Sequence, residues 1–231
     1  MRGDWGPQRY PIVPGHEIAG VVTATGPDVT RFTAGDHVGV GCMVNSCGQC
    51  ASCRNGDEQY CQVGTVFTYG SPDRDGTVTQ GGYSTHIVAD ARFVLSIPDR
   101  IGLAAAAPLL CAGITTYNPL RRWGVGPGTV SVNLDMDAFL SLLAVDGTIV
   151  SVGAAPEPVT FNGMLLGARR TVTGSMIGGI TLTQEMLDFC GEHGLGADVE
   201  VIPASQVNQA YERVLASDVR YRFVIDIATL N

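Results

Sequence analysis

The sequence has few aromatic residues, fewer basic than acidic side chains, and no long uninterrupted apolar run. Aromatic residues make up 7% of the 231 residues, and 22 acidic side chains against 14 basic ones give a net charge of −8. A nucleic-acid-binding protein needs a basic footprint, so this charge argues against that class. The longest uncharged stretch, residues 101–120, contains two prolines and an asparagine. It predicts a buried helix and turn rather than a membrane span.

A signal peptide is also missing from the residues at the start of the sequence. The first five residues include Arg2 and Asp4 and contain no apolar segment of that kind. Hydrophobic residues nevertheless make up 45% of the sequence, which is enough apolar surface to offset the entropy lost on folding. We therefore expect a folded, soluble, cytoplasmic protein with neither a nucleic-acid nor a membrane partner.

The first half of the sequence predicts short strands separated by turns. Strands are expected at residues 18–22, at the end of 32–40, at 81–88 and at 93–97. Five of the seven cysteines lie in residues 42–61, which we call the cysteine lobe. Together these patterns predict an irregular, β-rich, small-barrel domain.

After Pro98 the pattern changes to alternating helices and strands. Helices are expected at residues 104–110, 137–143, 184–193 and 207–215, and strands at 147–153, 171–177, 198–202 and 221–227. Thr183 is expected to cap the third of these helices and Gly194 to end it. Alternation of this kind implies an α/β layer with parallel strands.

Four cysteines have a metal-binding spacing. Cys47, Cys50, Cys53 and Cys61 form C-x2-C-x2-C-x7-C. Four thiolates fill the tetrahedral shell of a structural zinc ion and leave no position for water. Two alternatives are weaker. Disulfides need an oxidising compartment, and the bacterial iron–sulfur run has a shorter last spacing and a proline after its fourth cysteine.

A second set of potential ligands is spread along the chain. Pro14-Gly15-His16-Glu17 predicts a turn before an apolar strand, and Cys111 precedes Ala112-Gly113. An imidazole, a carboxylate and a thiol can serve as three ligands of an open metal site. On these residues alone, a histidine that bonds to the backbone of a turn is the simpler explanation of His16.

Several segments, in order along the chain, resemble the medium-chain zinc alcohol dehydrogenases, and in particular their cinnamyl-alcohol-dehydrogenase branch. Residues 10–20 resemble the zinc-binding GHE segment, and the cysteine lobe resembles the structural zinc lobe. The other matching segments are residues 39–44, 58–61, 79–83, 108–117, 174–179 and 219–226. The resemblance implies an α/β protein with an irregular, GroES-like, β-rich catalytic domain and a Rossmann-type parallel sheet.

The resemblance also implies an activity, which is reversible hydride transfer between NADP(H) and a small alcohol or aldehyde, in a homodimer. The four clustered cysteines would hold a structural zinc ion. His16, Glu17 and Cys111 would lie at a catalytic zinc ion, which lowers the pKa of the alcohol.

Four further roles follow from the resemblance by position. Thr115 would lie near the nicotinamide, and Arg220 near the ribose or phosphates of the cofactor. Trp5 and Phe67 would line the substrate pocket. Each residue also has a plain structural explanation: a helix hydroxyl bonded to backbone for Thr115, a solvated charge for Arg220, and ordinary core packing for the two aromatic residues.

Two features of the family pattern are missing from this sequence. The family carries a further cysteine ligand and a proton relay before the GHE segment, but no cysteine precedes His16 here. A Rossmann site needs G-x-G-x-x-G between a strand and a helix. Here Gly128-Thr129 is followed almost directly by residues 130–137. These residues resemble a segment that lies well after the fingerprint in the family sequence. We therefore expect a reduced, partly deleted nucleotide-binding domain.

These matches predict three parts of the chain. Residues 1–118 would form the catalytic domain, with the cysteine lobe as its zinc lobe. Residues 119–202 would be the remnant of a Rossmann domain, and residues 203–231 would return to the catalytic domain.

The missing features leave alternatives open. The chain is a truncated or internally deleted gene product, an engineered deletion, or a sequence that omits parts of the protein. The functional alternative is a catalytically impaired, zinc-stabilised remnant that acts only in binding or dimerisation. A zinc-free relative of the quinone reductases is a further option, which the four clustered cysteines disfavour.

Overall fold

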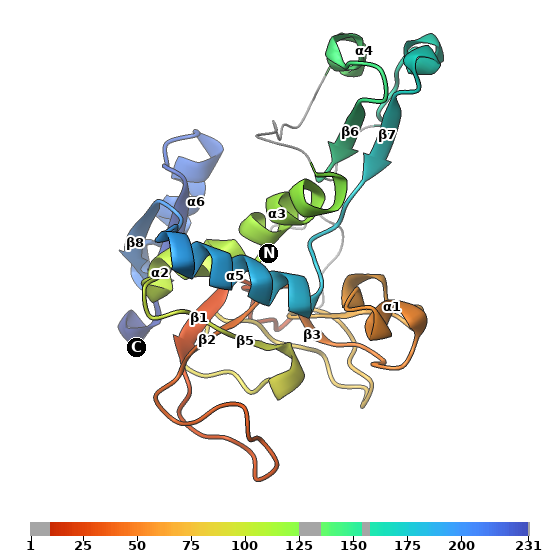
Figure 1. Cartoon of the computed structure of the whole chain (residues 1–231). Helices are drawn as coiled ribbons and strands as arrows, with labels where there is room; N and C mark the ends of the chain where they lie inside the picture. The colour runs from red at the N-terminus through yellow and green to blue at the C-terminus, as the bar shows by residue number, and fades with distance from the viewer. Residues whose placement is uncertain (1–9, 125–134, 154–157, 231) are drawn as a thin grey trace. The chain divides into compact units, whose positions relative to one another are not determined.

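The computed structural model describes residues 10–124, 135–153 and 158–230. The chain forms two compact units (Figure 1). The larger unit combines residues 1–114 with residues 178–231, and the smaller unit consists of residues 115–177.

The larger unit contains a three-stranded antiparallel sheet in the order β1-β2-β5. Its strands are β1 (Ile18–Val21), β2 (His37–Val40) and β5 (Val94–Ser96). Ile18 lies opposite Val40 on one side, and Val40 lies opposite Val94 on the other. Apolar, β-branched residues thus pair across this sheet, as the sequence pattern predicts.

The strand expected at residues 81–88 does not form, so that prediction was wrong. The backbone N–H groups of Gly81, Gly82 and Tyr83 instead donate to carbonyl groups of residues 13–15, at 2.6–3.0 Å. Those residues form the turn before His16 and not a strand. The hydrogen bonds of the segment are therefore satisfied by a loop, without a regular ladder.

The cysteine lobe contains β3 (Met43–Asn45), which pairs antiparallel with β4 (Val66–Phe67). Between these strands the chain forms α1 (Ala51–Arg54) and the 3-10 helix η1 (Glu58–Tyr60).

A pair of parallel strands lies near the C-terminal end. β8 (Val199–Pro203) pairs with β9 (Arg222–Asp226), and α6 (Val207–Leu215) connects them. This is the strand–helix–strand order that the alternating sequence pattern predicts. The remaining short helices of the larger unit are η2 (Ala91–Phe93), α2 (Leu103–Ala106), η3 (Ala107–Leu110), η5 (Ala204–Gln206) and η6 (Ile227–Thr229).

The long helix α5 (Ile180–His193) begins earlier than expected. Thr183 lies inside the helix, where its hydroxyl donates to the carbonyl of Gly179 at 2.8 Å, so the predicted cap was wrong. A threonine can bond backwards within a helix as well as cap its start. Gly194 ends the helix in the left-handed conformation with φ 65°, as predicted.

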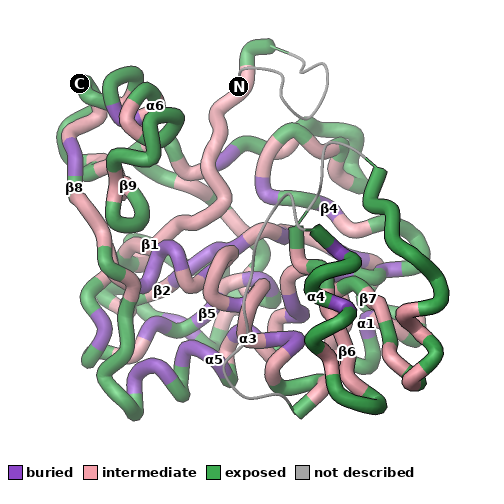
Figure 2. Tube along the Cα trace, turned by 90° about the horizontal axis from the view of Figure 1, so that it is seen from above, coloured by how far each residue is buried: buried purple, intermediate pink, exposed green. Residues whose placement is uncertain are grey.

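The core of the larger unit is formed by apolar residues of several elements. Leu95, Leu110, Ile114, Met186 and Leu187 are at most 2% exposed, and buried stretches are visible along β5 and α5 in Figure 2. The side chain of Gln184 on α5 accepts a hydrogen bond from the amide of Ser96 at 2.8 Å and donates to its carbonyl at 3.0 Å. This side chain thus ties α5 to β5.

The smaller unit contains a parallel pair formed by β6 (Thr148–Ser151) and β7 (Thr171–Gly174). Its other elements are α4 (Met136–Leu142), η4 (Gly163–Ala168) and most of α3 (Ala112–Trp123). The helix and both strands agree with the sequence pattern. Among the residues that the structure describes, no helix is long and apolar enough to cross a membrane.

The start of α5 lies very close to the cysteine lobe, and this contact generates a prediction. A β-carbon on Gly179 would lie 1.6 Å from the carbonyl oxygen of Gly56. We expect Gly179→Ala to lower the free energy of unfolding by about 1–3 kcal/mol, because the backbone must shift to admit the methyl group. The measurement is the urea midpoint followed by circular dichroism.

The matched control is Gly20→Ala, because a β-carbon there has no atom within 4 Å. Its midpoint is expected to stay the same or rise slightly. Equal midpoints for the two variants would contradict the tight contact at Gly179.

Candidate metal centres

The sulfur atoms of Cys47, Cys50, Cys53 and Cys61 all lie within 4.8 Å of one another. The Cys50 and Cys53 sulfurs are 3.4 Å apart, and the Cys47 and Cys53 sulfurs are 3.8 Å apart. Sulfur atoms bound to one tetrahedral zinc ion are spaced on this scale, since each zinc–sulfur bond is about 2.3 Å long. The lobe therefore has the donor set of a closed, structural zinc site.

Backbone amides point at these sulfur atoms. The amide of Cys50 donates to the Cys47 sulfur at 3.3 Å, and that of Gln62 donates to the Cys50 sulfur at 3.4 Å. Hydrogen bonds from the backbone of Cys53 and Gln62 lower the pKa of Cys50 to about 6. Burial raises the pKa of Cys53 to about 11. The loop thus already stabilises one thiolate, the form that binds metal.

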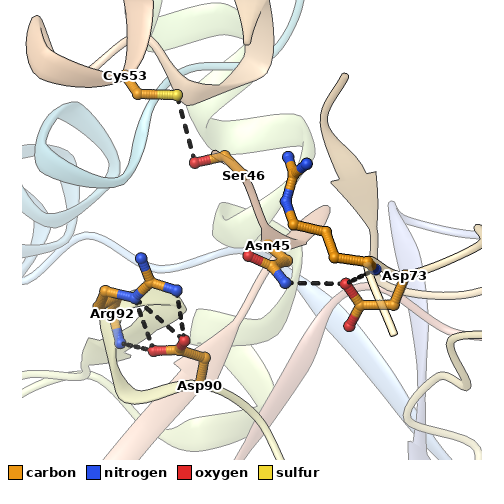
Figure 3. Close-up of polar contacts among 7 residues, drawn as sticks. Asn45, Ser46, Cys53, Asp73, Asp90 and Arg92 are labelled. Atoms are coloured by element: carbon orange, nitrogen blue, oxygen red, sulfur yellow. Dashed lines mark hydrogen bonds and ion pairs between the residues drawn. The ribbon is translucent and has the colours of Figure 1, made fainter. Parts of the chain in front are cut away.

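Polar contacts hold the lobe in place (Figure 3). The Cys53 thiol donates to the Ser46 hydroxyl at 3.4 Å, and the Asn45 amide donates to Asp73 at 2.8 Å. The carboxylate of Glu58 accepts a hydrogen bond from the first amide of α5, that of Ile180, at 3.0 Å. An acidic group at a helix N-terminus is favourable, so this contact joins the lobe to α5.

A second cluster joins residues that are far apart in the sequence. The sulfur atoms of Cys42 and Cys111 and a ring nitrogen of His16 lie within 4.8 Å of one another, and all three residues are half-buried. The His16 Nε2 and Cys111 Sγ atoms are 3.3 Å apart. His16 leaves the turn at Gly15, Cys42 follows β2, and Cys111 follows η3.

The charges in this cluster are coupled. Hydrogen bonding with Cys42, aided by His16, lowers the pKa of Cys111 to about 5. The hydrogen bond with Cys111 raises the pKa of His16, and the contact between the two thiols raises the pKa of Cys42. The Cys111 thiol is thus shifted toward its thiolate, which is the form that binds metal. Metal binding there must release protons.

Glu17 lies beside this cluster without joining it. Burial raises the pKa of Glu17, and the guanidinium of Arg222 opposes that rise. The two side chains form an ion pair at 3.7 Å. The ring of Tyr69 stacks on His16 at a centroid distance of 5.8 Å, which restricts how the imidazole can turn.

Known proteins similar to this chain decide its family. Residues 1–99 match the family model described as "Alcohol dehydrogenase GroES-like domain". The probable formaldehyde dehydrogenase AdhA of Bacillus subtilis is 47% identical, over 98% of this chain and 85% of that protein. The chain belongs to the alcohol dehydrogenase family.

Two further similarities define its place within the alcohol dehydrogenase family. NADP-dependent alcohol dehydrogenase C 1 of Mycolicibacterium smegmatis is 46% identical, over 100% of this chain and 86% of that protein. A solved cinnamyl alcohol dehydrogenase of Sorghum bicolor has a TM-score of 0.91 and 33% identity, over 100% of this chain and 86% of that chain. The zinc medium-chain family, its cinnamyl-alcohol-dehydrogenase-like branch and the α/β fold with a GroES-like domain are thereby confirmed.

Within the region that aligns with its relatives, this chain has fewer residues than they have. The match to the Mycolicibacterium smegmatis enzyme extends over 301 residues, whereas this chain has 231. The relative therefore carries internal residues without a counterpart here, which agrees with the expectation of a reduced nucleotide-binding domain.

Of the four other predicted site residues, the structure describes Phe67, Thr115 and Arg220. Phe67 ends β4 and is 41% exposed. Thr115 is half-buried on α3 in the smaller unit, and Arg220 is exposed before β9 in the larger unit. Trp5 lies outside the described residues. The cofactor and pocket roles of these four residues stay predictions.

Sequence reasoning missed Cys42 as a member of the second cluster. The residue was recognised only as part of the matching segment 39–44. The sequence did contain a signal for it. Cys42 comes two residues after the end of a predicted strand, which places its thiol at a known edge of the sheet. What the sequence could not supply was the contact of that edge with Cys111.

The cysteine lobe predicts one tightly held zinc ion per chain. We expect Cys53→Ser to remove this zinc ion, because the Cys53 sulfur lies 3.8 Å and 3.4 Å from the sulfurs of Cys47 and Cys50 and serine is a poor zinc ligand. Elemental analysis of the dialysed protein measures the loss. Cys190→Ser is the control, since Cys190 is buried on α5 and belongs to neither cluster. Unchanged zinc content in Cys53→Ser would contradict the structural site.

Proposed function

We propose that this chain catalyses reversible oxidation of a small alcohol to its aldehyde with NADP(H), at the centre built on His16, Glu17 and Cys111. The observation that carries this proposal is the 3.3 Å approach of the His16 and Cys111 donor atoms, 95 positions apart in the sequence. A protein gains little by holding a thiolate and an imidazole together in a half-buried place unless they act on a ligand.

The residues at this centre fit a zinc ion. Nitrogen and sulfur donors within 4.8 Å of one another are the donors that zinc prefers. Zinc bound there would supply Lewis-acid chemistry to an alcohol or aldehyde oxygen. His16 and Cys111 would bind the metal, and Tyr69 would hold the orientation of the His16 ring. Glu17 would lie beside it, with its charge balanced by Arg222.

The cofactor assignment rests on relatives and on position. The Mycolicibacterium smegmatis relative is named as NADP-dependent, and we extend this preference to the present chain. Thr115 is proposed to face the nicotinamide and Arg220 the ribose or phosphates. Trp5 and Phe67 are proposed to line the substrate pocket.

We also propose the organisation of the working protein. Residues 1–118 and 203–231 would form the catalytic domain, and residues 119–202 the reduced nucleotide-binding part. The protein would act as a homodimer in the cytoplasm. Sheet edges of the nucleotide-binding part are the natural place for two copies to join, because unpaired strand edges readily pair.

One observation favours a second candidate function. The sequence contains no G-x-G-x-x-G fingerprint, which normally cradles the cofactor's pyrophosphate at a helix N-terminus. A zinc-stabilised binding or dimerisation module would need no such loop. Titration with NADPH, followed by its fluorescence, separates the candidates. Saturable binding supports the dehydrogenase, and absence of binding supports the module.

The activity itself is tested with NADPH and an aldehyde. We expect the zinc-loaded protein to oxidise NADPH in the presence of cinnamaldehyde or formaldehyde, measured by the loss of nicotinamide absorbance. His16→Ala is expected to lower kcat/KM by at least about 100-fold, because losing a metal ligand costs no less than losing a group that orients one.

His193→Ala is the matched control, because His193 is exposed at the end of α5 and belongs to neither metal centre. Its kcat/KM is expected to equal that of the unmodified chain. Equal rates for His16→Ala and His193→Ala would overturn the proposed catalytic centre.

A further inference from the structure

The second metal centre contains a donor that the family resemblance does not assign. The resemblance points to His16, Glu17 and Cys111, yet the three donor atoms that come within 4.8 Å of one another belong to His16, Cys42 and Cys111. Glu17 is not a member of this set, and its carboxylate is paired with Arg222. Cys42 is the first cysteine of the sequence.

The backbone around Cys42 is held firmly against the segment that carries Cys111. A β-carbon on Gly41 would lie 2.8 Å from the carbonyl oxygen of Leu110, so only glycine permits this approach. The side chain of Thr68 donates to the Gly41 carbonyl, and the amide of Thr68 donates to the Cys42 carbonyl at 3.0 Å. These contacts place the Cys42 sulfur beside Cys111 independently of any metal.

The contacts of the Cys42 side chain leave its sulfur available. Its thiol lies 3.9 Å from the Leu110 carbonyl, at the long limit for a sulfur hydrogen bond. Its sulfur also lies within 4.8 Å of the Cys111 sulfur, close enough for both sulfurs to bind one ion. A divalent cation between the two sulfurs would bind both as thiolates and release the protons of the thiols.

We propose that Cys42 is a ligand of the catalytic metal in this chain, so that Cys42, Cys111 and His16 hold zinc through two thiolates and one imidazole. This inference rests on the proposed function and specifies its metal site. Two cysteines and one histidine are a donor set known for catalytic zinc, and they leave the fourth position open for a substrate oxygen. Glu17 then serves as a neighbouring charge and not as a ligand.

Cobalt substitution tests the ligand directly. The zinc protein is treated with a chelator that empties the open centre and leaves the closed four-cysteine site filled. The open centre is then loaded with Co²⁺, and its sulfur-to-cobalt charge-transfer absorption is recorded. Two thiolates at the metal predict that Cys42→Ser lowers this absorption to about half, because each bound thiolate contributes to it. Cobalt affinity is expected to fall by at least about 100-fold.

Two variants serve as controls. Cys190→Ser removes a buried thiol outside both clusters and should leave absorption and affinity unchanged. Cys42→Asp keeps an anionic ligand and should recover most of the affinity but none of the lost charge-transfer intensity. Retention of the structural zinc and of the circular dichroism spectrum shows that each variant is folded.

A second measurement needs no variant. X-ray absorption at the cobalt edge of the unmodified chain, with Co²⁺ at the open centre only, should show two cobalt–sulfur bonds. A single cobalt–sulfur bond would overturn the assignment, as would full absorption and affinity in folded Cys42→Ser.

The results separate this inference from the proposed function. Halved absorption in Cys42→Ser, together with no aldehyde reduction by the unmodified chain, supports the ligand and refutes the activity. Aldehyde reduction by the unmodified chain with unchanged absorption in Cys42→Ser supports the activity and refutes the ligand.

Discussion

The packing of Leu110 against β2 is the contact on which the second metal centre depends. Leu110 is 1% exposed and lies over Gly39 and Gly41, where β-carbons would come within 2.9 Å of its side chain or carbonyl. The two glycines remove the bulk that would keep η3 away from the sheet. Cys111 directly follows that helix and Cys42 directly follows Gly41, so a single apolar contact brings the two thiols together.

The two metal centres are built in different ways. The four-cysteine site is local, because its ligands all come from one short loop and backbone amides already point at the sulfur atoms. The centre at His16 is assembled from three distant segments and exists only when the sheet and η3 are packed. A closed shell suits a structural role, and a set of three donors with an open position suits chemistry.

These differences explain what could be predicted from the sequence. The spacing of the four cysteines between Cys47 and Cys61 already indicates that their sulfur atoms meet at one site. The parallel pairs β6–β7 and β8–β9 follow from apolar runs that alternate with helices. Three features were missed or predicted wrongly, and two of them depend on long-range contacts. Residues 81–88 bond to the turn before His16 and not to a strand, Thr183 bonds backwards within α5, and Cys42 meets Cys111 only through the buried Leu110.

The hydrogen bond between Glu58 and the first amide of α5 has a thermodynamic consequence. Glu58 opens the short helix that leads to Cys61, one of the four predicted zinc ligands. Ordering of the lobe by a bound zinc ion would therefore also order the start of a helix that contributes to the core. A ligand that binds only the folded state adds stability in proportion to the logarithm of its free concentration. The melting temperature of the larger unit is then no fixed property of the chain, but one that rises with the zinc activity of its surroundings.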